Sequence, residues 1–354
     1  LHVALIWLIC DFVFWIVRRI RKKPFRRYVA GGVAVVLSAG VLLYGWIAAH
    51  HVFRTSYTVE AETLKAPLRI ALIADSHLGV TLDGEGFAKE MERIQAEQPD
   101  LVVLVGDFVD DDSSAADMQR ACKALGSLET PYGVYFVYGN HDWEGFNYGS
   151  AGKKIFGEDY AAHTIRADLA AAWKRAFGEE YSPVWRKEVK GYTFVGAHWI
   201  ADHCRAFNEI GVPQTPEWFK ENGQTIDPSK PFFYLQHPPP KNTCHGSWLW
   251  GHDDGRLTET LSHYRNAIAI TGHSHASLTR EQAIWQGAFT AIDASSLSYT
   301  GLEYGDIKPH WRENDNNNGN ASAENAKKIM RRMSTGSRFL HTEREPLPLS
   351  IGSS

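Results

Sequence analysis

The stretch "YGVYFVYGNHD", residues 132 to 142, begins as a run of β-branched and aromatic residues and ends in an amide, an imidazole and a carboxylate. Its first part is typical of a strand. Gly and Asn tolerate left-handed backbone, and Asp can bond to its own backbone, so a plain turn would explain the ending. A functional site would explain it equally well, and the rest of the chain has to decide between the two interpretations.

Short apolar runs recur along the chain and alternate with amphipathic stretches. Residues 86–98 and the region near 116–129 have the spacing of helices that bury one face. This alternation predicts an α/β fold with buried strands, and ligands collect at the carboxyl ends of such strands. The runs that we expect to form strands are 68–75, 101–107, 132–140, 192–198, 232–237, 267–273 and 288–293.

Five of these predicted strands end in side chains that can bind a metal. The endings are Asp75-Ser76-His77, Gly106-Asp107, Asn140-His141-Asp142, His237 and Gly272-His273-Ser274-His275. Gathered at one sheet edge, carboxylates and imidazoles would repel one another or stay unsatisfied without a cation. Two divalent ions would resolve this, because a carboxylate can bridge metals about 3.5–4 Å apart, and such a pair polarises a phosphoryl group and lowers the pKa of bound water.

The ordered endings resemble the motifs of the calcineurin-like metallophosphoesterases, which are D-x-H, G-D-x-x-D, G-N-H-D/E, a single His and G-H-x-H. The corresponding stretches are "DSH" at 75–77, "GDFVD" at 106–110, "GNHD" at 139–142, His237 in "LQHPPP" and "GHSH" at 272–275. The set is complete, in order, and lies within residues 68 to about 300. The resemblance implies a four-layer αββα metallophosphoesterase sandwich that hydrolyses a phosphodiester or phosphomonoester with a hydroxide activated by two metals.

The resemblance also implies a role for each motif residue. Asp75, His77 and His275 would hold one metal. Asn140, His237 and His273 would hold the other, and Asp107 would bridge the two. His141 would face the substrate as general acid or charge stabiliser, and Asp142 would orient it. These ligand types suit two divalent ions of Mn, Fe, Zn or Co.

Two features differ from particular branches of that family. Asp110 stands where purple acid phosphatases have a Tyr, so no tyrosinate–iron site is expected. "ASLT" at 276–279 follows the last motif, where many membrane-anchored relatives have "GGQ". The chain resembles the membrane-anchored bacterial branch through "GNHD" and a secreted-type branch beyond residue 143. The aromatic residues of the insertion 143–189 either line a substrate wall or pack against the sandwich.

The amino-terminal residues predict a membrane anchor. Residues 28–49 contain no charged side chain over 22 positions, which is about the length of a spanning helix. Residues 1–17 are also apolar but are interrupted by Asp11, so we expect one or two transmembrane helices. The basic stretch 18–27 should stay on the cytoplasmic side, which predicts that everything after residue 50 lies outside the cytoplasmic membrane.

The remaining boundaries follow from composition. We expect a membrane anchor over 1–50, a linker over 51–67, the catalytic domain over 68–312, and a flexible loop with a C-terminal tail over 313–354. The 37 Lys and Arg residues nearly balance the 41 Asp and Glu residues, which argues against a nucleic-acid-coating protein. The cysteines show neither zinc-ribbon spacing nor a dense disulfide framework.

The sequence therefore predicts a membrane-anchored metal-dependent phosphoesterase with an extracytoplasmic catalytic domain. Membrane tethering favours a lipid-linked or envelope-derived phosphate ester as substrate. One alternative is a catalytically silent scaffold with the same fold, although scaffolds typically lose ligands that this chain retains. A nuclease is another, but the charge balance shows no sign of the basic groove that it would need. The oligomeric state stays open.

Overall fold

The computed structural model divides the chain into two compact units, residues 1–51 and 52–354. It describes residues 1–22, 28–58, 66–110, 113–142, 174, 179–200, 214–244, 247, 255–278, 283–300 and 348–353. For residues 348–353 it describes the backbone alone. The basic stretch 18–27 and the insertion 143–189 are therefore described only in part.

The amino-terminal unit is a pair of helices, α1 (His2–Arg21) and α2 (Val29–His50). The Trp7 indole donates a hydrogen bond to the Tyr28 hydroxyl (2.7 Å), which donates to Asp11 on α1 (2.6 Å). Among the described residues, α2 alone has the length and apolar composition of a membrane span. The expected second span within residues 1–17 does form a helix, but it does not meet that criterion.

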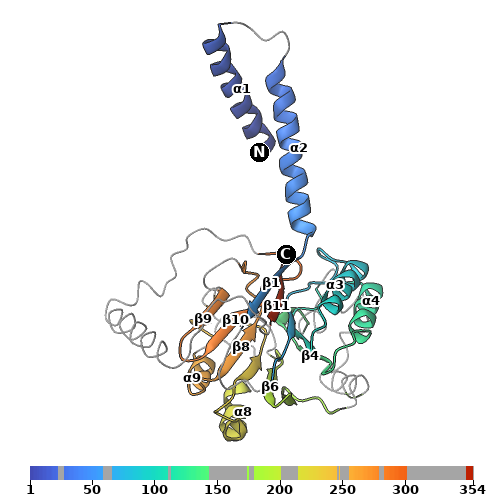
Figure 1. Cartoon of the computed structure of the whole chain (residues 1–354), viewed down its shortest axis with the longest axis vertical. Coiled ribbons are helices and arrows are strands. Elements are labelled where there is room, and N and C mark those ends of the chain that lie inside the picture. Colours follow the sequence, from blue (N-terminus) through green and yellow to red (C-terminus); the bar gives the residue numbers. More distant parts are fainter. Residues whose placement is uncertain are drawn as a thin grey trace, which may run out of the picture. The chain divides into compact units, whose positions relative to one another are not determined.

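The first sheet of the second unit has five described strands in the order β1-β11-β2-β3-β4. β1 and β11 lie side by side in it (Figure 1). β11, β2, β3 and β4 run parallel, and β1 runs antiparallel to β11. The strands are β1 (Phe53–Thr58), β2 (Ile70–Ile73), β3 (Leu101–Val105), β4 (Val134–Val137) and β11 (Pro348–Ser353). Helices α3 (Gly84–Ala96) and α4 (Ala115–Gly126) connect the parallel strands β2, β3 and β4.

Two of these strands fall where none was expected. β1 lies within the predicted linker 51–67, and β11 lies within the predicted tail 313–354. β1 reads "FRTSYT", which is mostly polar, and four of its residues are exposed and two half-buried, so it lacks the apolar run that marks a buried strand. β11 lies far along the chain from its partners, and its pairing is a tertiary property that local pattern cannot reveal.

The second sheet has six strands in the order β5-β6-β7-β8-β10-β9. β6, β7, β8 and β10 run parallel, and β5 and β9 form antiparallel edges. The strands are β5 (Val184–Val189), β6 (Tyr192–Ala197), β7 (Phe232–Leu235), β8 (Ala267–Thr271), β9 (Ile284–Gln286) and β10 (Thr290–Asp293). The described helices between them are α8 (Thr215–Asn222), the short 3-10 helix η2 (Gly223–Thr225) and α9 (Arg256–Ser262).

One apolar core joins the two sheets. Leu72 and Val103 of the first sheet share this cluster with Phe194, Leu235 and Ile270 of the second. Alternate residues of the same strands point to the opposite faces and are buried there as well, which explains why these strands read as continuous apolar runs.

Helices cover the outer faces. Phe87 and Met91 of α3 pack in a cluster with Ile73 of β2. Phe219 of α8 and Leu261 of α9 pack in a separate cluster that covers the second sheet. α3 begins where the Asp83 carboxylate accepts the Gly86 N–H (2.7 Å), a side-chain cap that satisfies one of the free amides of the first turn.

The joint core can be tested at Phe194. Its ring is fully buried, stacks on Phe233 at 4.5 Å and lies 6.2 Å from Tyr135 of the first sheet. Phe194→Ala should lower the free energy of unfolding by about 3–5 kcal/mol, because it removes apolar contacts and leaves a cavity. Urea unfolding of the detergent-solubilised chain measures this, with the partly exposed Tyr132→Ala as control. A loss below about 1 kcal/mol would show that the two sheets do not share this core.

Candidate metal centre

The residues that follow the parallel strands turn sharply out of the strand direction. Asp75, His77, Asp107, His273 and His275 have backbone φ values of 51°, 39°, 50°, 70° and 50°. Residues other than Gly rarely adopt this left-handed backbone conformation. They do so mainly where the surrounding structure requires it, often at functional sites. These turns bring residues from β2, β3 and β8 to a common place at the strand ends.

Two glycines allow the turns to approach one another. A Cβ atom at Gly139 would lie 2.2 Å from the Asp107 Oδ1, and one at Gly272 would lie 2.4 Å from the Asp75 Oδ2. Both distances are far below van der Waals contact. The glycines of "GNHD" and "GHSH" are therefore required by close packing against the two carboxylates.

Asp75, His77 and His275 form the first group of potential ligands. The Asp75 Oδ1 lies 2.9 Å from the His275 Nε2 and 3.8 Å from the His77 Nε2. The two Nε2 atoms are 3.0 Å apart. Three donor atoms so close together can coordinate one ion.

Asp107, His237 and His273 form the second group. The Asp107 Oδ2 lies 2.9 Å from the His237 Nε2, and the His273 Nδ1 lies 3.2 Å from that same nitrogen. The Asp107 Oδ2 also lies 3.8 Å from the Nε2 of His77, so this carboxylate reaches both groups. That position is compatible with a bridge between two ions.

Hydrogen bonds orient three of the imidazoles. The His237 Nδ1 lies 2.7 Å from a backbone carbonyl of β3, and the His275 Nδ1 lies 3.0 Å from the Tyr299 carbonyl. The His77 Nδ1 lies 2.5 Å from the Asp110 Oδ2. Because an acceptor faces each Nδ1, we assign the single proton of the neutral ring to that atom, which would direct the Nε2 lone pair of each neutral ring into the centre.

The buried polar atoms fit a cation. The Asp75 Oδ1 and the Asn140 Oδ1 are buried and accept no hydrogen bond from the described residues. Burial alone would raise the pKa of Asp75 and Asp107, yet the neighbouring imidazoles hold the pKa of both well below its usual range. Burial likewise opposes charge on His237, but Asp107 and Asp75 raise its pKa to about 9. This mixture of carboxylate, imidazole and amide donors suits first-row divalent metals.

The structure places Asp142 differently from the expectation that it orients His141. Its Oδ1 accepts the backbone N–H groups of Phe108 (2.8 Å) and Val109 (3.1 Å), and its Oδ2 accepts that of Gly139 (2.8 Å). Burial, and then the charge of Asp107, raise the pKa of Asp142 to about 7, against these donors. Asp142 therefore ties the turn after β3 to the turn after β4.

The carboxylate beside His141 is that of Asp110. The Asp110 Oδ1 lies 3.6 Å from the His141 Nδ1, while its other oxygen contacts His77. Burial lowers the pKa of His141, but Asp110 and Asp107 outweigh burial and raise it. The His141 side chain is 43% exposed. His141 also lies close enough to His77 and Asp107 for these three to hold an ion, so its freedom from metal stays a prediction.

Residues 293–298, which the sequence did not mark as part of the site, form hydrogen bonds with two turns that carry potential ligands. The Ser296 Oγ donates to the Asp75 carbonyl (2.9 Å), and the Ser298 N–H reaches the same oxygen (3.3 Å). Asp293, at the end of β10, accepts hydrogen bonds from the Ser274 hydroxyl and from the Ser295 N–H. In the sequence, this segment can be recognised by the polar residues "DASSLS" at 293–298, which end the predicted strand 288–293.

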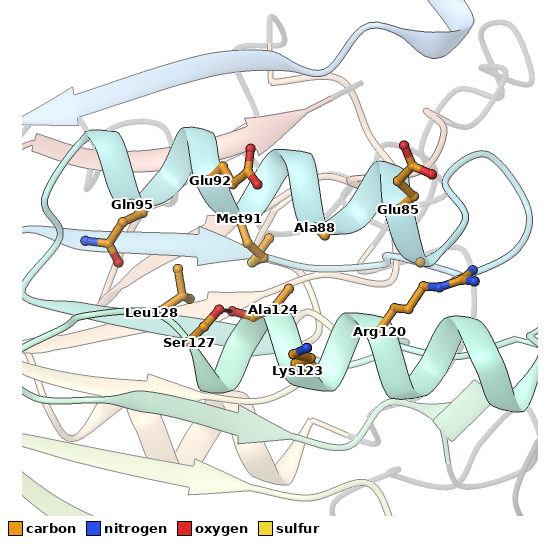
Figure 2. Close-up of a pocket in the computed structure, with 11 residues that line it drawn as sticks. Glu85, Ala88, Met91, Glu92, Gln95, Arg120, Lys123, Ala124, Ser127 and Leu128 are labelled. Carbon is orange, nitrogen blue, oxygen red and sulfur yellow. Dashed lines mark hydrogen bonds between the residues drawn. The ribbon is translucent and has the colours of Figure 1, made fainter.

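Trp185 of the insertion 143–189 and a groove between α3 and α4 lie outside the groups of potential ligands. The insertion 143–189 lies mostly outside the described residues, and its Trp185 is buried in the core beside Tyr135 (5.6 Å), which fits packing at that position. A hollow of about 560 Å³ lies between α3 and α4 (Figure 2). Glu85 and Glu92 border it on α3, and Arg120 borders it on α4. It is an open groove between two surface helices.

Comparison with known proteins identifies the family. Residues 68–277 match the model of the calcineurin-like phosphoesterases. A transmembrane protein with metallophosphoesterase domain from Danio rerio is 30% identical over 40% of this chain and 36% of its own length. The UDP-2,3-diacylglucosamine pyrophosphatase LpxG from Chlamydia trachomatis is 28% identical over 43% of this chain and 46% of its own length.

A solved dimetal phosphatase from Danio rerio aligns with 67% of this chain and 90% of its own, at 13% identity and a TM-score of 0.44. The chain spans less than half the length of the curated relatives that it matches. The family match covers more than half of the chain and includes all of the potential ligands from Asp75 to His275. This chain therefore belongs to the calcineurin-like phosphoesterases, a family of hydrolases that act on phosphoric esters.

Proposed function

We propose that the protein is a metal-dependent phosphoesterase that hydrolyses a phosphodiester or a phosphomonoester. The observation that carries this proposal is the gathering of buried carboxylates and inward-facing imidazoles at the strand ends of both sheets. Two divalent ions bound there would supply a Lewis-acid pair for the phosphoryl oxygens and would acidify water. The domain would have the four-layer αββα arrangement, since helices cover the outer faces of the paired sheets.

The ligand sets that we propose follow the two groups. Asp75, His77 and His275 would hold one ion, with the Asp75 Oδ1 as the oxygen ligand. The second ion would take His237, His273 and the Asn140 Oδ1, and the Asp107 Oδ2 would bridge. Ligation requires neutral imidazoles, so loading with metal should release the protons that nearby carboxylates favour against burial. Asp110 is the foremost of these carboxylates for His77, and Asp107 is the foremost for His237.

We assign the leaving-group proton to His141. Its side chain is the partly exposed imidazole of the "GNHD" turn, and its backbone N–H donates to the Asp107 Oδ1 (2.8 Å), which fixes the turn beside the bridging carboxylate. Asp110 lies beside the Nδ1 and favours the protonated ring. A protonated imidazole in this position is a suitable general acid for the departing oxygen.

The substrate that we propose is a phosphate ester of the membrane or envelope. α2 is long and apolar enough to span a membrane, and two relatives are named as transmembrane proteins with a metallophosphoesterase domain. The Chlamydia trachomatis relative is named as a pyrophosphatase of a diacylated nucleotide sugar. With the basic stretch 18–27 in the cytoplasm, the catalytic domain would lie on the other side of the membrane.

The metal assignment predicts different losses in two variants. Purified wild-type chain incubated with Mn²⁺, Co²⁺, Zn²⁺ or Fe²⁺ should bind about two ions and hydrolyse bis(p-nitrophenyl) phosphate or p-nitrophenyl phosphate. Asp107→Asn should lower the occupancy of both sites, because a neutral amide bridges two cations poorly, whereas His77→Ala should mainly empty one. Elemental analysis measures this, with Asp227→Asn on an exposed turn as control. Loss of the same single ion in both variants would refute the bridge, and a fully loaded chain without turnover would favour the scaffold.

The role of His141 predicts a dependence on the leaving group. His141→Ala should keep the bound metal and lower kcat about 10²–10⁴-fold on alkyl esters, with a smaller defect on nitrophenyl esters, whose leaving groups need little protonation.

Asp110→Asn should lower the pKa of His141, as measured by NMR titration, because it removes the neighbouring carboxylate. Asp142→Asn should leave that pKa near its wild-type value and instead destabilise the fold by about 1–3 kcal/mol, because one backbone N–H loses its acceptor. A fall in the His141 pKa only in Asp142→Asn would restore the original assignment, and loss of metal in His141→Ala would make it a ligand.

The proposed orientation is tested by reporter fusions. Alkaline phosphatase fused after residue 58 should be active, because this reporter works only outside the cytoplasm, and a green fluorescent protein fusion at the same point should be dark. Replacing the Arg and Lys residues of 18–22 by Gln should weaken this preference. Fluorescence without phosphatase activity in the unaltered chain would place the catalytic domain in the cytoplasm.

A further inference from the structure

Tyr299 is built into the frame of the metal centre. Its backbone N–H lies 3.1 Å from the Ser296 Oγ, and its carbonyl accepts the hydrogen bond from the His275 Nδ1 (3.0 Å). Ser296 in turn bonds to the carbonyl of Asp75. The backbone of Tyr299 is therefore held by contacts that also involve Asp75 and His275, two of the potential ligands.

The Tyr299 ring packs against two imidazoles of the first group. Its centroid lies 4.5 Å from that of His275 and 5.6 Å from that of His77, with interplanar angles of 51° and 37°. Even so, 43% of the residue is exposed. One part of the ring is therefore fixed against the centre while another part remains accessible.

The two partly exposed rings beside His77 differ in chemistry. His141 contacts His77 edge-on, with ring centroids 4.8 Å apart, and as a whole residue it is half-buried, whereas Tyr299 is exposed. On the side of the second group, the Trp199 ring stacks on His273 at 6.4 Å but is only 2% exposed. Of these flanking rings, Tyr299 offers an open aromatic surface and His141 offers a titratable one.

A phosphate ester at this centre has two parts with opposite requirements. The phosphoryl oxygens would be drawn to the cations, whereas the organic group must lie outside a cluster that contains Asp75, Asp107 and Asp110. An aromatic face carries no net charge, and its contact with a flat or apolar group is energetically favourable. Tyr299 presents such a face at the edge of the cluster.

We propose that Tyr299 contacts the organic group of the substrate and favours esters with a flat or apolar group on phosphorus. This proposal rests on the phosphoesterase function proposed above. It makes Tyr299 a residue that determines specificity, whereas the metals and His141 recognise the phosphoryl group common to all esters.

The test separates the organic group from the phosphoryl group by direct binding. Calorimetry on the Mn²⁺-loaded full chain uses phenylphosphonate, methylphosphonate and inorganic phosphate, none of which needs turnover. The wild-type chain should bind phenylphosphonate more tightly than methylphosphonate. Tyr299→Ala should weaken phenylphosphonate binding about three- to tenfold and leave inorganic phosphate within about twofold, because only the aromatic contact is lost. Tyr299→Phe should retain the preference.

The matched control is Tyr132→Ala, which removes another partly exposed tyrosine from the turn before β4, at the opposite end of that strand from "GNHD". It should change none of the three affinities. With bis(p-nitrophenyl) phosphate as substrate, Tyr299→Ala should raise KM by the same factor as the loss of phenylphosphonate affinity.

Two results would overturn the proposal. Equal weakening of all three ligands in Tyr299→Ala, or loss of bound Mn²⁺, would show that Tyr299 only supports the imidazoles. Unchanged binding of all three would show that it makes no substrate contact. If the wild-type chain hydrolyses no ester but Tyr299→Ala still abolishes the phenyl preference, the phosphoesterase function fails while the contact stands.

Discussion

The arrangement of this domain depends on the burial of two carboxylates, Asp75 and Asp107, at strand ends of the first sheet to which the second sheet also contributes side chains. A buried negative charge is costly unless cationic or hydrogen-bonding groups surround it. Here His237 and His275 come from the second sheet to carboxylates that follow strands of the first. Attraction at this edge therefore complements the apolar core, and it requires both sheets to place their strand ends within a few ångströms.

This requirement explains the unusual backbone of the turns. Five potential ligands adopt left-handed φ values, and Gly139 and Gly272 leave room for carboxylate oxygens where any side chain would collide. The Asp142 carboxylate connects two successive turns of this region, because it accepts hydrogen bonds from three of their backbone N–H groups. Strain in these turns is compensated by the contacts that they make possible, which is common where geometry serves chemistry.

Much of the fold and most of the proposed ligands could be predicted from sequence, since buried parallel strands are continuous apolar runs and their ends carry chemically distinct residues. The predicted family was confirmed by the match over residues 68–277. The role of each individual motif residue was harder to predict from the sequence than the family. "GNHD" suggests that Asp142 serves its neighbour His141, but in the structure Asp142 points to backbone amides, while Asp110 from another motif lies beside that histidine. Adjacency in sequence did not determine contact in space. β1, β11 and the support from Ser296 depend on pairings between distant segments, which a local pattern does not contain.

The position of β11 also constrains the order of folding. Among the described strands it lies between β1 and β2, so β1 joins this sheet through residues 348–353; β1 and β11 lie side by side in Figure 1. During synthesis, β1 emerges early, and its described partner β11 follows about 290 residues later. Contacts of such long sequence separation slow folding, and an unpaired β2 edge is a template for wrong association in the interval. By pairing with the β2 edge, β11 removes that template as well as completing the described sheet.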